Sequence, residues 1–220
     1  AVMVANEHLE RARESGDTGA DPASIAACAA VVRHFEDAAR AAGSAADSAA
    51  REIAAAAQTI VQAFLGNHRV YACGNGGSAS DAEHLVAELV GRLEQERPGL
   101  PAIALPANSS TVTAIGNDYG FSDVFSRQVR ALGGAGDILV VFSASGNSGN
   151  VVAAITAAHE REMLVVAFTG DDGGKVREHL AASDHLINVP ATRIMRVQEL
   201  HRVGIHALCD VIDRILLGGL

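Results

Sequence analysis

The chain is short of basic residues and of long apolar runs. Its 220 residues contain 17 lysines and arginines against 26 aspartates and glutamates, a formal net charge of −9. This balance argues against nucleic acid or an anionic membrane surface as the main partner, because both attract basic proteins. No apolar stretch approaches the roughly 18 residues that a membrane-spanning helix needs. The sequence therefore predicts no nucleic-acid partner and no membrane partner.

Cysteine and aromatic residues are also scarce. The three cysteines, Cys28, Cys73 and Cys209, are far apart and form no Cys-x-x-Cys motif. They fit reduced thiols of a cytoplasmic protein better than a disulfide framework or a zinc ribbon, and the opening residues lack the features of a secretory signal. With no tryptophan, 2 tyrosines and 6 phenylalanines, a core of small aliphatic side chains buries little area per residue. We therefore expect burial between subunits to supplement this core.

The length of the chain predicts a single domain after an N-terminal tail. Residues 1–20 are polar, contain glycines and show no clear periodicity, so we expect a mobile tail. A helix is predicted to begin at Asp21, as its cap, with Pro22 in the first helical position. A second helix has apolar residues at helical spacing and is expected to end at Gly66. The two helices would form a helical hairpin at the start of a single domain, residues 21–220.

Five short apolar runs follow, separated by roughly 15–30 residues that read as loop and helix. Unbroken runs of this kind are typical of strands buried on both faces of a parallel sheet with helical crossovers. A long final helix has an apolar seam that begins at Val197 and continues to Ile215. We predict an α/β fold, a three-layer sandwich with a five-stranded parallel sheet. The five runs are "RVYAC", "PAIAL", "DILVVFS", "MLVVAFT" and "HLINV".

Two of the predicted strands end in loops that are rich in glycine and serine. The first ends in Gly74-Asn75-Gly76-Gly77-Ser78 and the third in "SASGNSGN", residues 143–150, and each loop leads into a predicted helix. In an open parallel sheet, ligands bind beyond the carboxyl ends of the strands. Glycines let backbone N–H groups approach an anion, serines add hydroxyl donors, and a helix N-terminus adds partial positive charge. The loops therefore predict a phosphate-monoester site that needs no lysine or arginine.

Two different interpretations of these loops remain open. The segment "GNGGSA" matches the G-x-G-x-x-G/A pattern of dinucleotide-binding folds, but that fingerprint also needs an acidic residue about 20 positions later, at the end of the second strand. The second strand, "PAIALPAN", has no carboxylate at its end. Alternatively, both loops are ordinary tight turns, although the second has more serines than a turn needs.

His84 and Glu88 lie in the predicted helix just beyond the first loop. They are four residues apart, about 40° around an α-helix, so both side chains can meet one ligand. Such a pair can bind a divalent metal, or supply a base and the partner that orients it; the alternative is a solvated helix face with a chance His–Glu pair. In the last helix Gln198 and His206 lie off the apolar seam, with His206 nearly opposite to it. His201 lies nearer the seam and is predicted to be a hydrogen-bonded structural histidine.

Five long segments of the chain are distinctive: "CGNGGSASDAEHLVAELVGR", "RPGLPAIAL", "TAIGNDYGFSDVFSRQV", "GDILVVFSASGNSGNV" and "VQELHRVGIHALCDVID". Together these segments resemble one family, the phosphoheptose isomerases of the sugar isomerase (SIS) domain superfamily. Their motifs occur in the family's order and cover about residues 45–217. The resemblance implies a SIS domain.

The resemblance implies an activity, an assembly and a set of site residues. Enzymes of this family interconvert the ketose sedoheptulose 7-phosphate and an aldose heptose 7-phosphate, and their usual assembly is a homotetramer with sites shared between subunits. The phosphate is held by residues that match Ser143, Ser145, Asn147 and Ser148, with Gly76, Gly77 and Ser78 close by. The sugar hydroxyls are met by residues that match Asn75, Asn117, Asp118 and Gln198. Zinc, one ion per subunit, is bound by residues that match His84, Glu88, Gln198 and His206.

The expected chemistry follows from what aldose–ketose exchange requires. A proton must leave the carbon beside the carbonyl and return to the neighbouring carbon, through an enediol. We expect Glu88 to be the base for this transfer, and His206 to act as general acid/base on the oxygens or the second carbon. A zinc ion would polarise the carbonyl and stabilise the enediolate. Metal binding and base catalysis would then compete for one carboxylate.

The chain departs from the family's pattern at two positions. Ala144 replaces the threonine of a loop that usually reads Ser-Thr-Ser-Gly-Asn-Ser, and Met195 occupies the position of an aspartate that precedes Gln198. These changes leave open the isomerisation of a longer, octulose phosphate in specialised metabolism. Two functions without catalysis also stay open, a tetrameric SIS scaffold that binds the replication initiator protein and a sugar-phosphate sensor. The complete set of zinc-ligand residues favours the enzyme.

Overall fold

The computed structural model describes residues 22–219 of the chain. The predicted tail of residues 1–20 and the predicted cap Asp21 lie outside the described residues. The chain divides into two compact units, Ala1–Ser44 and Ala45–Leu220, and the second contains the whole sheet. Among the described residues, no helix is both long and apolar enough to cross a membrane. The prediction of a single domain after the tail stays a prediction.

One continuous helix, α2 (Pro22–Leu65), stands where the sequence predicted a helical hairpin. The hairpin prediction is wrong, because the chain stays helical without a break from Pro22 to Leu65. A single glycine costs a helix only about 1 kcal/mol relative to alanine, and the alanines around Gly43 favour the helix strongly. The predicted end of the second helix is correct, since Asn67 adopts a left-handed conformation, with φ of 64°, just beyond Leu65.

The predicted five-stranded parallel sheet is confirmed. Its strand order is β2-β1-β3-β4-β5, and every neighbouring pair is parallel. Strands β1 and β3 are fully buried, but β2 lies at the edge and leaves Ile103 39% exposed. Burial on both faces was therefore wrongly predicted for this strand, because an edge strand has a sheet neighbour on one side only. The strands are β1 (Val70–Gly74), β2 (Ala102–Ala104), β3 (Ile138–Ser143), β4 (Leu164–Gly170) and β5 (His185–Val189).

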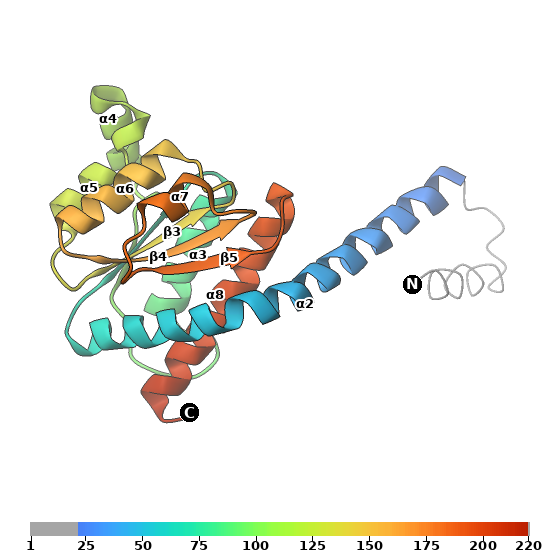
Figure 1. The fold of residues 1–220 in the computed structure, drawn as a ribbon, viewed down its shortest axis with the longest axis horizontal. Coiled ribbons are helices and arrows are strands. Elements are labelled where there is room, and N and C mark those ends of the chain that lie inside the picture. The colour runs from blue at the N-terminus through green and yellow to red at the C-terminus, as the bar shows by residue number, and fades with distance from the viewer. Residues whose placement is uncertain (1–21, 220) are drawn as a thin grey trace. The chain divides into compact units, whose positions relative to one another are not determined.

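Helices cover both faces of the sheet and complete the three layers (Figure 1). One apolar core lies between the sheet and α3, α8 and residues 45–65 of α2, and it contains Phe142 and Phe168. A second core lies on the other face, beneath α5, α6 and α7, and it contains Leu139 and Ile155. The helices are α3 (Gly77–Val90), α4 (Ser109–Tyr119), α5 (Ser126–Leu132), α6 (Gly149–Glu160), α7 (Gly174–His179) and α8 (Ile194–Leu217), with a 3-10 turn η1 (Phe121–Asp123).

The last helix, α8, buries the seam that its apolar spacing predicts. Val197, Leu200 and Leu208 are buried, whereas His206 is exposed, as expected for a residue opposite the seam. A Cβ on Gly204 would lie 3.0 Å from Phe168 Cε1. Glycine at this position therefore allows α8 to pack closely against the aromatic part of the core.

Strands β1 and β3 are adjacent in the sheet, although β2 lies between them in the sequence. Their register pairs Gly74 with Phe142, so the two strands end almost level with each other. The order of connections reverses at this point, which makes it a topological switch point of the kind that binds ligands in open α/β sheets. The two loops that the sequence singled out therefore lie side by side.

Candidate active site

The loop after β1 requires glycine because two backbone segments approach it closely. A Cβ on Gly74 would lie 2.5 Å from the carbonyl oxygen of Ser78 and 2.9 Å from that of Phe142. Gly76 has a φ of 57°, a conformation that glycine adopts without steric cost. The turn leads directly into α3, so the partial positive charge of that helix N-terminus lies at the carboxyl edge of the sheet.

The loop after β3 is a compact turn in which serine and asparagine side chains bind one another. Ser143 Oγ donates to Ser148 Oγ at 3.3 Å, and the backbone N–H of Asn147 donates to Ser145 Oγ at 3.2 Å. Asn147 Oδ1 also accepts from the backbone N–H of Lys175 at 3.2 Å, which joins the loop to the start of α7. Because α6 begins directly after Ser148, the hydroxyls and the helix dipole lie in one place.

Two asparagine side chains join the two loops. Asn75 Nδ2 donates to Asn150 Oδ1 at 2.8 Å, and Asn150 Nδ2 donates to Asn75 Oδ1 at 2.9 Å. Asn150 lies in the first turn of α6 and is only 6% exposed. Each amide therefore satisfies the other in a place with little access to water. We call these two residues the asparagine pair.

Helices α3 and α8 pack with polar side chains opposite each other at successive turns. Gln198 lies over Gly77, since a Cβ on Gly77 would be 2.6 Å from Gln198 Nε2. One turn further along each helix, Arg202 Nη2 donates to Asp81 Oδ1 at 2.9 Å. The residue numbers increase together along both helices, so the two helices run in the same direction at this contact. The next turn of each helix carries a histidine.

His84, Glu88 and His206 converge between α3 and α8. His84 Nε2 lies 2.8 Å from His206 Nε2 and 3.4 Å from Glu88 Oε1. One potential ligand atom from each of the three residues lies within 4.8 Å of the others. Two imidazoles and a carboxylate are the protein donors of many catalytic zinc sites, in which a fourth position stays open. The donor set and its spacing fit a divalent metal such as zinc.

The surroundings of this cluster favour a neutral imidazole at His84. Burial lowers the pKa of His84, and the nearby positive charge of Arg202 lowers it further, while Glu88 acts in the opposite direction. A neutral ring is the form that binds a metal. Burial also raises the pKa of the Asp81 carboxyl group, although Arg202 partly offsets this effect.

An open cavity of about 550 Å³ lies between the N-terminal parts of α3 and α8. Met195, which departs from the family's pattern, forms part of its wall beside Gln198. Met195 therefore lines a cavity that also contacts Asp81 and Arg202, one turn before the two histidines. The lining residues are Gly77, Ser80, Asp81, Met195, Gln198, Glu199 and Arg202.

Comparison with known proteins identifies the family. Residues 33–170 match the family model described as "SIS domain". A phosphoheptose isomerase from Laribacter hongkongensis is 57% identical over 167 residues, which cover 76% of this chain and 85% of that protein. The chain belongs to the phosphoheptose isomerase family. The resemblance seen in the sequence is thereby confirmed, and the family is one of sugar-phosphate isomerases.

Solved structures of phosphoheptose isomerases share the fold. The structure from Neisseria gonorrhoeae is 50% identical, with a TM-score of 0.79, and the match covers 83% of this chain and 96% of that one. The structure from Francisella tularensis is 40% identical, with a TM-score of 0.83, over 86% of this chain and 98% of that one. The three-layer architecture is therefore that of the family.

Two predicted sugar-binding residues stand apart from the loops and the cluster. Asn117 and Asp118 are exposed on α4, where Asn117 Nδ2 donates to Asp118 Oδ1 at 2.7 Å. Within the described residues, these side chains bond to each other and not to the two loops. Gln198 lies two turns before His206 on α8. The sugar and zinc roles assigned to these residues stay predictions.

His201 is buried, in agreement with the predicted structural role. The backbone of Thr169 supplies at most a weak hydrogen bond to the ring, whose nitrogens have no closer partner among the described residues. The ring instead packs against Phe142 and Phe168, with centroid distances of 6.0 and 5.8 Å. Burial lowers the pKa of His201 to about 4, and the backbone of Thr169 offsets this only in part.

Three residues of the site escaped the sequence interpretation. Asn150 was considered only as part of a loop, and Asp81 and Arg202 were not considered. A signal was present for the last two, because Asp81 lies three residues before His84 and Arg202 four residues before His206. Helical spacing of this kind places each residue on the same face as the histidine. It could be used only once the two helices were known to pack together.

Proposed function

We propose that the chain interconverts sedoheptulose 7-phosphate and an aldose heptose 7-phosphate through an enediol. The convergence of His84, Glu88 and His206 beside two adjacent loops of the anion-binding type carries this proposal. A sugar phosphate offers both kinds of group that such a site needs, an anion at one end and a carbonyl at the other. The relatives named phosphoheptose isomerase support the same class of substrate.

The loop after β3 is proposed to hold the phosphate group. Its serines can donate hydroxyl hydrogen bonds to phosphate oxygens, and the N-terminus of α6 adds partial positive charge without a basic side chain. Ser78 is buried in the first turn of α3, directly after the neighbouring loop. The proposed phosphate ligands are Ser143, Ser145, Asn147 and Ser148, with Gly76, Gly77 and Ser78 alongside, and Asn75, Asn117, Asp118 and Gln198 are proposed to meet the sugar hydroxyls.

Glu88 is proposed to remove the proton from the carbon beside the carbonyl and to return it to the neighbouring carbon. His206 is proposed to exchange protons with the substrate oxygens. The two Nε2 atoms of His84 and His206 lie 2.8 Å apart, so one ring donates a hydrogen bond to the other when no metal is bound. With zinc bound, both nitrogens would be ligands instead. Well-placed acid–base groups typically contribute about 10²–10⁴-fold each.

A zinc ion is the proposed cofactor, held by His84, Glu88, Gln198 and His206. The ligand atoms of the two imidazoles and the carboxylate lie within 4.8 Å of one another, and Gln198 lies two turns before His206 on the same helix. When bound, zinc would polarise the substrate carbonyl and favour the enediolate. The neutral state favoured at His84 agrees with this role.

A homotetramer in the cytoplasm, with sites shared between subunits, is the proposed assembly. Residues 22–44 of α2 carry exposed apolar side chains at helical spacing, among them Val31 and Phe35. The exposure of His206 leaves room for a contribution from a neighbouring subunit. Buried, unpaired Cys73 and Cys209 agree with a reducing compartment.

The deciding experiment is turnover of sedoheptulose 7-phosphate by purified protein, followed by NMR of the products. It is run with added zinc, with a chelator, and with Glu88→Gln, which keeps the shape of the side chain but removes the base. A new aldose phosphate that is lost in the variant would support the reaction and the role of Glu88. Normal turnover by Glu88→Gln would exclude that carboxylate as the base.

A longer, octulose phosphate is the second candidate substrate, because Met195 gives the cavity wall an apolar side chain where the family's pattern has an aspartate. Octulose and heptulose phosphates are therefore compared at equal concentration. A higher kcat/KM for the octulose phosphate would move the assignment to the longer sugar. Absence of any turnover by folded protein would favour a sensor or a scaffold.

A further inference from the structure

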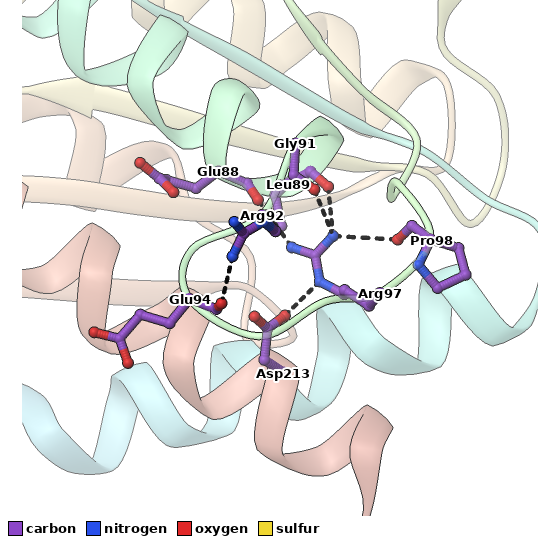
Figure 2. Close-up of polar contacts among 8 residues, drawn as sticks. All are labelled: Glu88, Leu89, Gly91, Arg92, Glu94, Arg97, Pro98 and Asp213. Atoms are coloured by element: carbon purple, nitrogen blue, oxygen red, sulfur yellow. Dashed lines mark hydrogen bonds and ion pairs between the residues drawn. The ribbon is translucent and has the colours of Figure 1, made fainter.

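Arg97 is the most heavily bonded basic side chain near the candidate site, and it is almost fully buried. Its side chain is 2% exposed, and Nε donates to Asp213 Oδ1 at 2.6 Å. Nη1 donates to the carbonyl oxygen of Leu89 at 2.9 Å, and Nη2 to that of Glu88 at 2.8 Å. Figure 2 shows the guanidinium group between the end of α3 and Asp213. A longer contact with Gly91 and one with Pro98 complete its environment.

The carbonyl groups that Arg97 binds belong to the last turn of α3. The final four carbonyl groups of an α-helix have no partner within the helix, and Glu88 and Leu89 supply two of them. A cation at this end also interacts favourably with the helix dipole. Arg97 therefore acts as the C-terminal cap of α3, delivered from the loop between α3 and β2.

The same guanidinium group joins α3 to α8. Asp213 lies seven residues after His206, which is two helical turns, and its side chain is 4% exposed. Asp81 and Arg202 connect the two helices on the other side of the cluster. The three converging side chains therefore lie between two ionic connections, of which the one through Arg97 is completely buried.

We propose that Arg97 is a positioning residue for the site, because it holds the backbone from which the Glu88 carboxylate extends. Its contact is with the carbonyl oxygen of Glu88 itself, while the Glu88 side chain points away from Arg97 (Figure 2). Tying that carbonyl group to α8 sets the distance between the carboxylate and His206. Both proton transfer and metal binding depend on this distance. The inference rests on the proposed function.

A purely structural role makes a different prediction. Buried ion pairs often add little net stability, because desolvation offsets the attraction between the charges. If Arg97 only stabilised the fold, its replacement would affect turnover no more than any other change that lowers the melting temperature equally. A positioning role instead lowers kcat and zinc affinity together and leaves the KM for the sugar phosphate unchanged, since the phosphate loop lies after another strand.

Arg97→Lys is the test, because lysine keeps the charge but cannot reach Asp213 and both carbonyl groups with one planar fork. Residues that orient metal ligands typically cost about 10–100-fold in affinity or activity when changed. We expect kcat, and zinc affinity measured by competition with a chromogenic chelator, to fall by amounts of this order. We expect KM to stay within about twofold of the wild type if the phosphate loop binds independently.

Ile155→Ala is the matched control, since Ile155 is fully buried in the core on the opposite face of the sheet. It lowers stability without touching α3 or α8. An Ile155→Ala protein with an equal fall in melting temperature should keep its kcat and zinc affinity. An equal loss in this control, or unchanged values in folded Arg97→Lys, would overturn the proposal.

Asp213→Asn is the second test variant, to be used if Arg97→Lys does not fold. Asparagine keeps an acceptor oxygen for Arg97 Nε but loses the charge, so the same two quantities should fall by a smaller factor. Unchanged values in this variant would overturn the proposal. If the wild type binds zinc but does not turn over the heptulose phosphate, the proposed function fails. The positioning role of Arg97 is then tested by the zinc affinity of the variant relative to that of the wild type. Failure of the wild type to bind zinc would overturn both.

Discussion

At the scale of single residues, Gly77 has the most direct influence on the candidate site. A Cβ at this position would lie 2.6 Å from Gln198 Nε2 and 2.8 Å from its Cδ. Gly77 is not among the glycines with positive φ, so alanine fits the backbone and only the flexible Gln198 side chain must move. An alanine at position 77 should therefore disturb the candidate site without lowering the stability of the fold.

Gly77→Ala is predicted to lower kcat/KM by roughly 10–100-fold, since small misplacements of a positioning group have effects of this size. Its melting temperature should stay close to that of the wild type. Steady-state kinetics and thermal unfolding measure the two quantities. In the Gly77→Ala/Gln198→Ala double variant the loss should not exceed that of Gln198→Ala alone, because both changes act through one side chain. If the losses in kcat/KM of the two single variants add up in the double variant, Gly77→Ala does not act through the Gln198 side chain.

His201 makes the stability of the protein sensitive to acid. Its pKa in the folded chain is about 4, against 6.5 for an ordinary histidine, because burial disfavours the charged ring. The unfolded chain therefore binds more protons than the folded chain between these pH values. The resulting stability is fully present above about pH 6.5, falls as the pH decreases below 6.5, and is lost below pH 4.

His201→Leu is predicted to remove this pH dependence, which corresponds to roughly 3 kcal/mol of unfolding free energy. Urea unfolding at several pH values between 7 and 4 measures it. The wild type should lose stability steeply over this range and the variant much less. If the unfolding free energy of both proteins falls equally with decreasing pH, His201 does not cause the pH dependence.

At the scale of structural elements, the asparagine pair joins two loops that come from different strands. Asn75 and Asn150 satisfy each other's amides in a place with little water, so the loss of one partner leaves the other unpaired. An unsatisfied buried polar group typically costs about 1–3 kcal/mol. The same contact fixes the position of the N-terminus of α3 relative to that of α6.

Asn150→Ala is predicted to lower the unfolding free energy by about 1–3 kcal/mol and to raise the KM for the sugar phosphate. KM should change more than kcat, because the phosphate loop moves while the cluster between α3 and α8 stays in place. Urea unfolding and steady-state kinetics measure the two effects. A fall in kcat at constant KM would mean that the loops do not bind the phosphate.

The elements also differ in how far local sequence determines them. The five strands were predicted within one or two residues, because unbroken runs of β-branched and aliphatic residues suit a buried sheet. The break in α2 was predicted wrongly, since a lone glycine among alanines does not end a helix. The edge position of β2 depends on the order of strands, which no short stretch of sequence encodes.

At the scale of the whole molecule, the exposed apolar side chains of residues 22–44 call for a partner. Phe35 is 70% exposed and Val31 56% exposed, an unusual arrangement for side chains of this size in an isolated subunit. Burial between subunits would also supplement a core that is poor in aromatic residues. This agrees with the proposed homotetramer.

Phe35→Glu is predicted to weaken the assembly, because a charge would have to be buried in an apolar contact. Light scattering after size-exclusion chromatography should give a tetramer for the wild type and smaller species for the variant. Gln58→Glu adds the same charge to an exposed position of the same helix, outside residues 22–44, and should remain a tetramer. A monomeric wild type would contradict the proposed assembly.

Local sequence patterns were enough to predict the class of fold, the two loops and the residues of the cluster. These features are local: apolar runs mark strands, glycines and serines mark the turns, and the spacing of His84 and Glu88 puts them on one helical face. Helical spacing also placed Gln198 and His206 off the apolar seam of the last helix, and the resemblance to the family added their predicted role as zinc ligands. All of this can be read within about one helical turn or one strand of each residue.

The contacts between residues that are distant in the sequence could not be predicted in this way, because they depend on how the elements pack. The asparagine pair, the contact of Asp81 with Arg202 and the binding of Arg97 to both Glu88 and Asp213 each join segments that are far apart in the chain or that meet at the end of a helix. The direction and register of α8 against α3 bring these side chains together. Packing against the sheet sets that register, because the buried faces of both helices must fill one core.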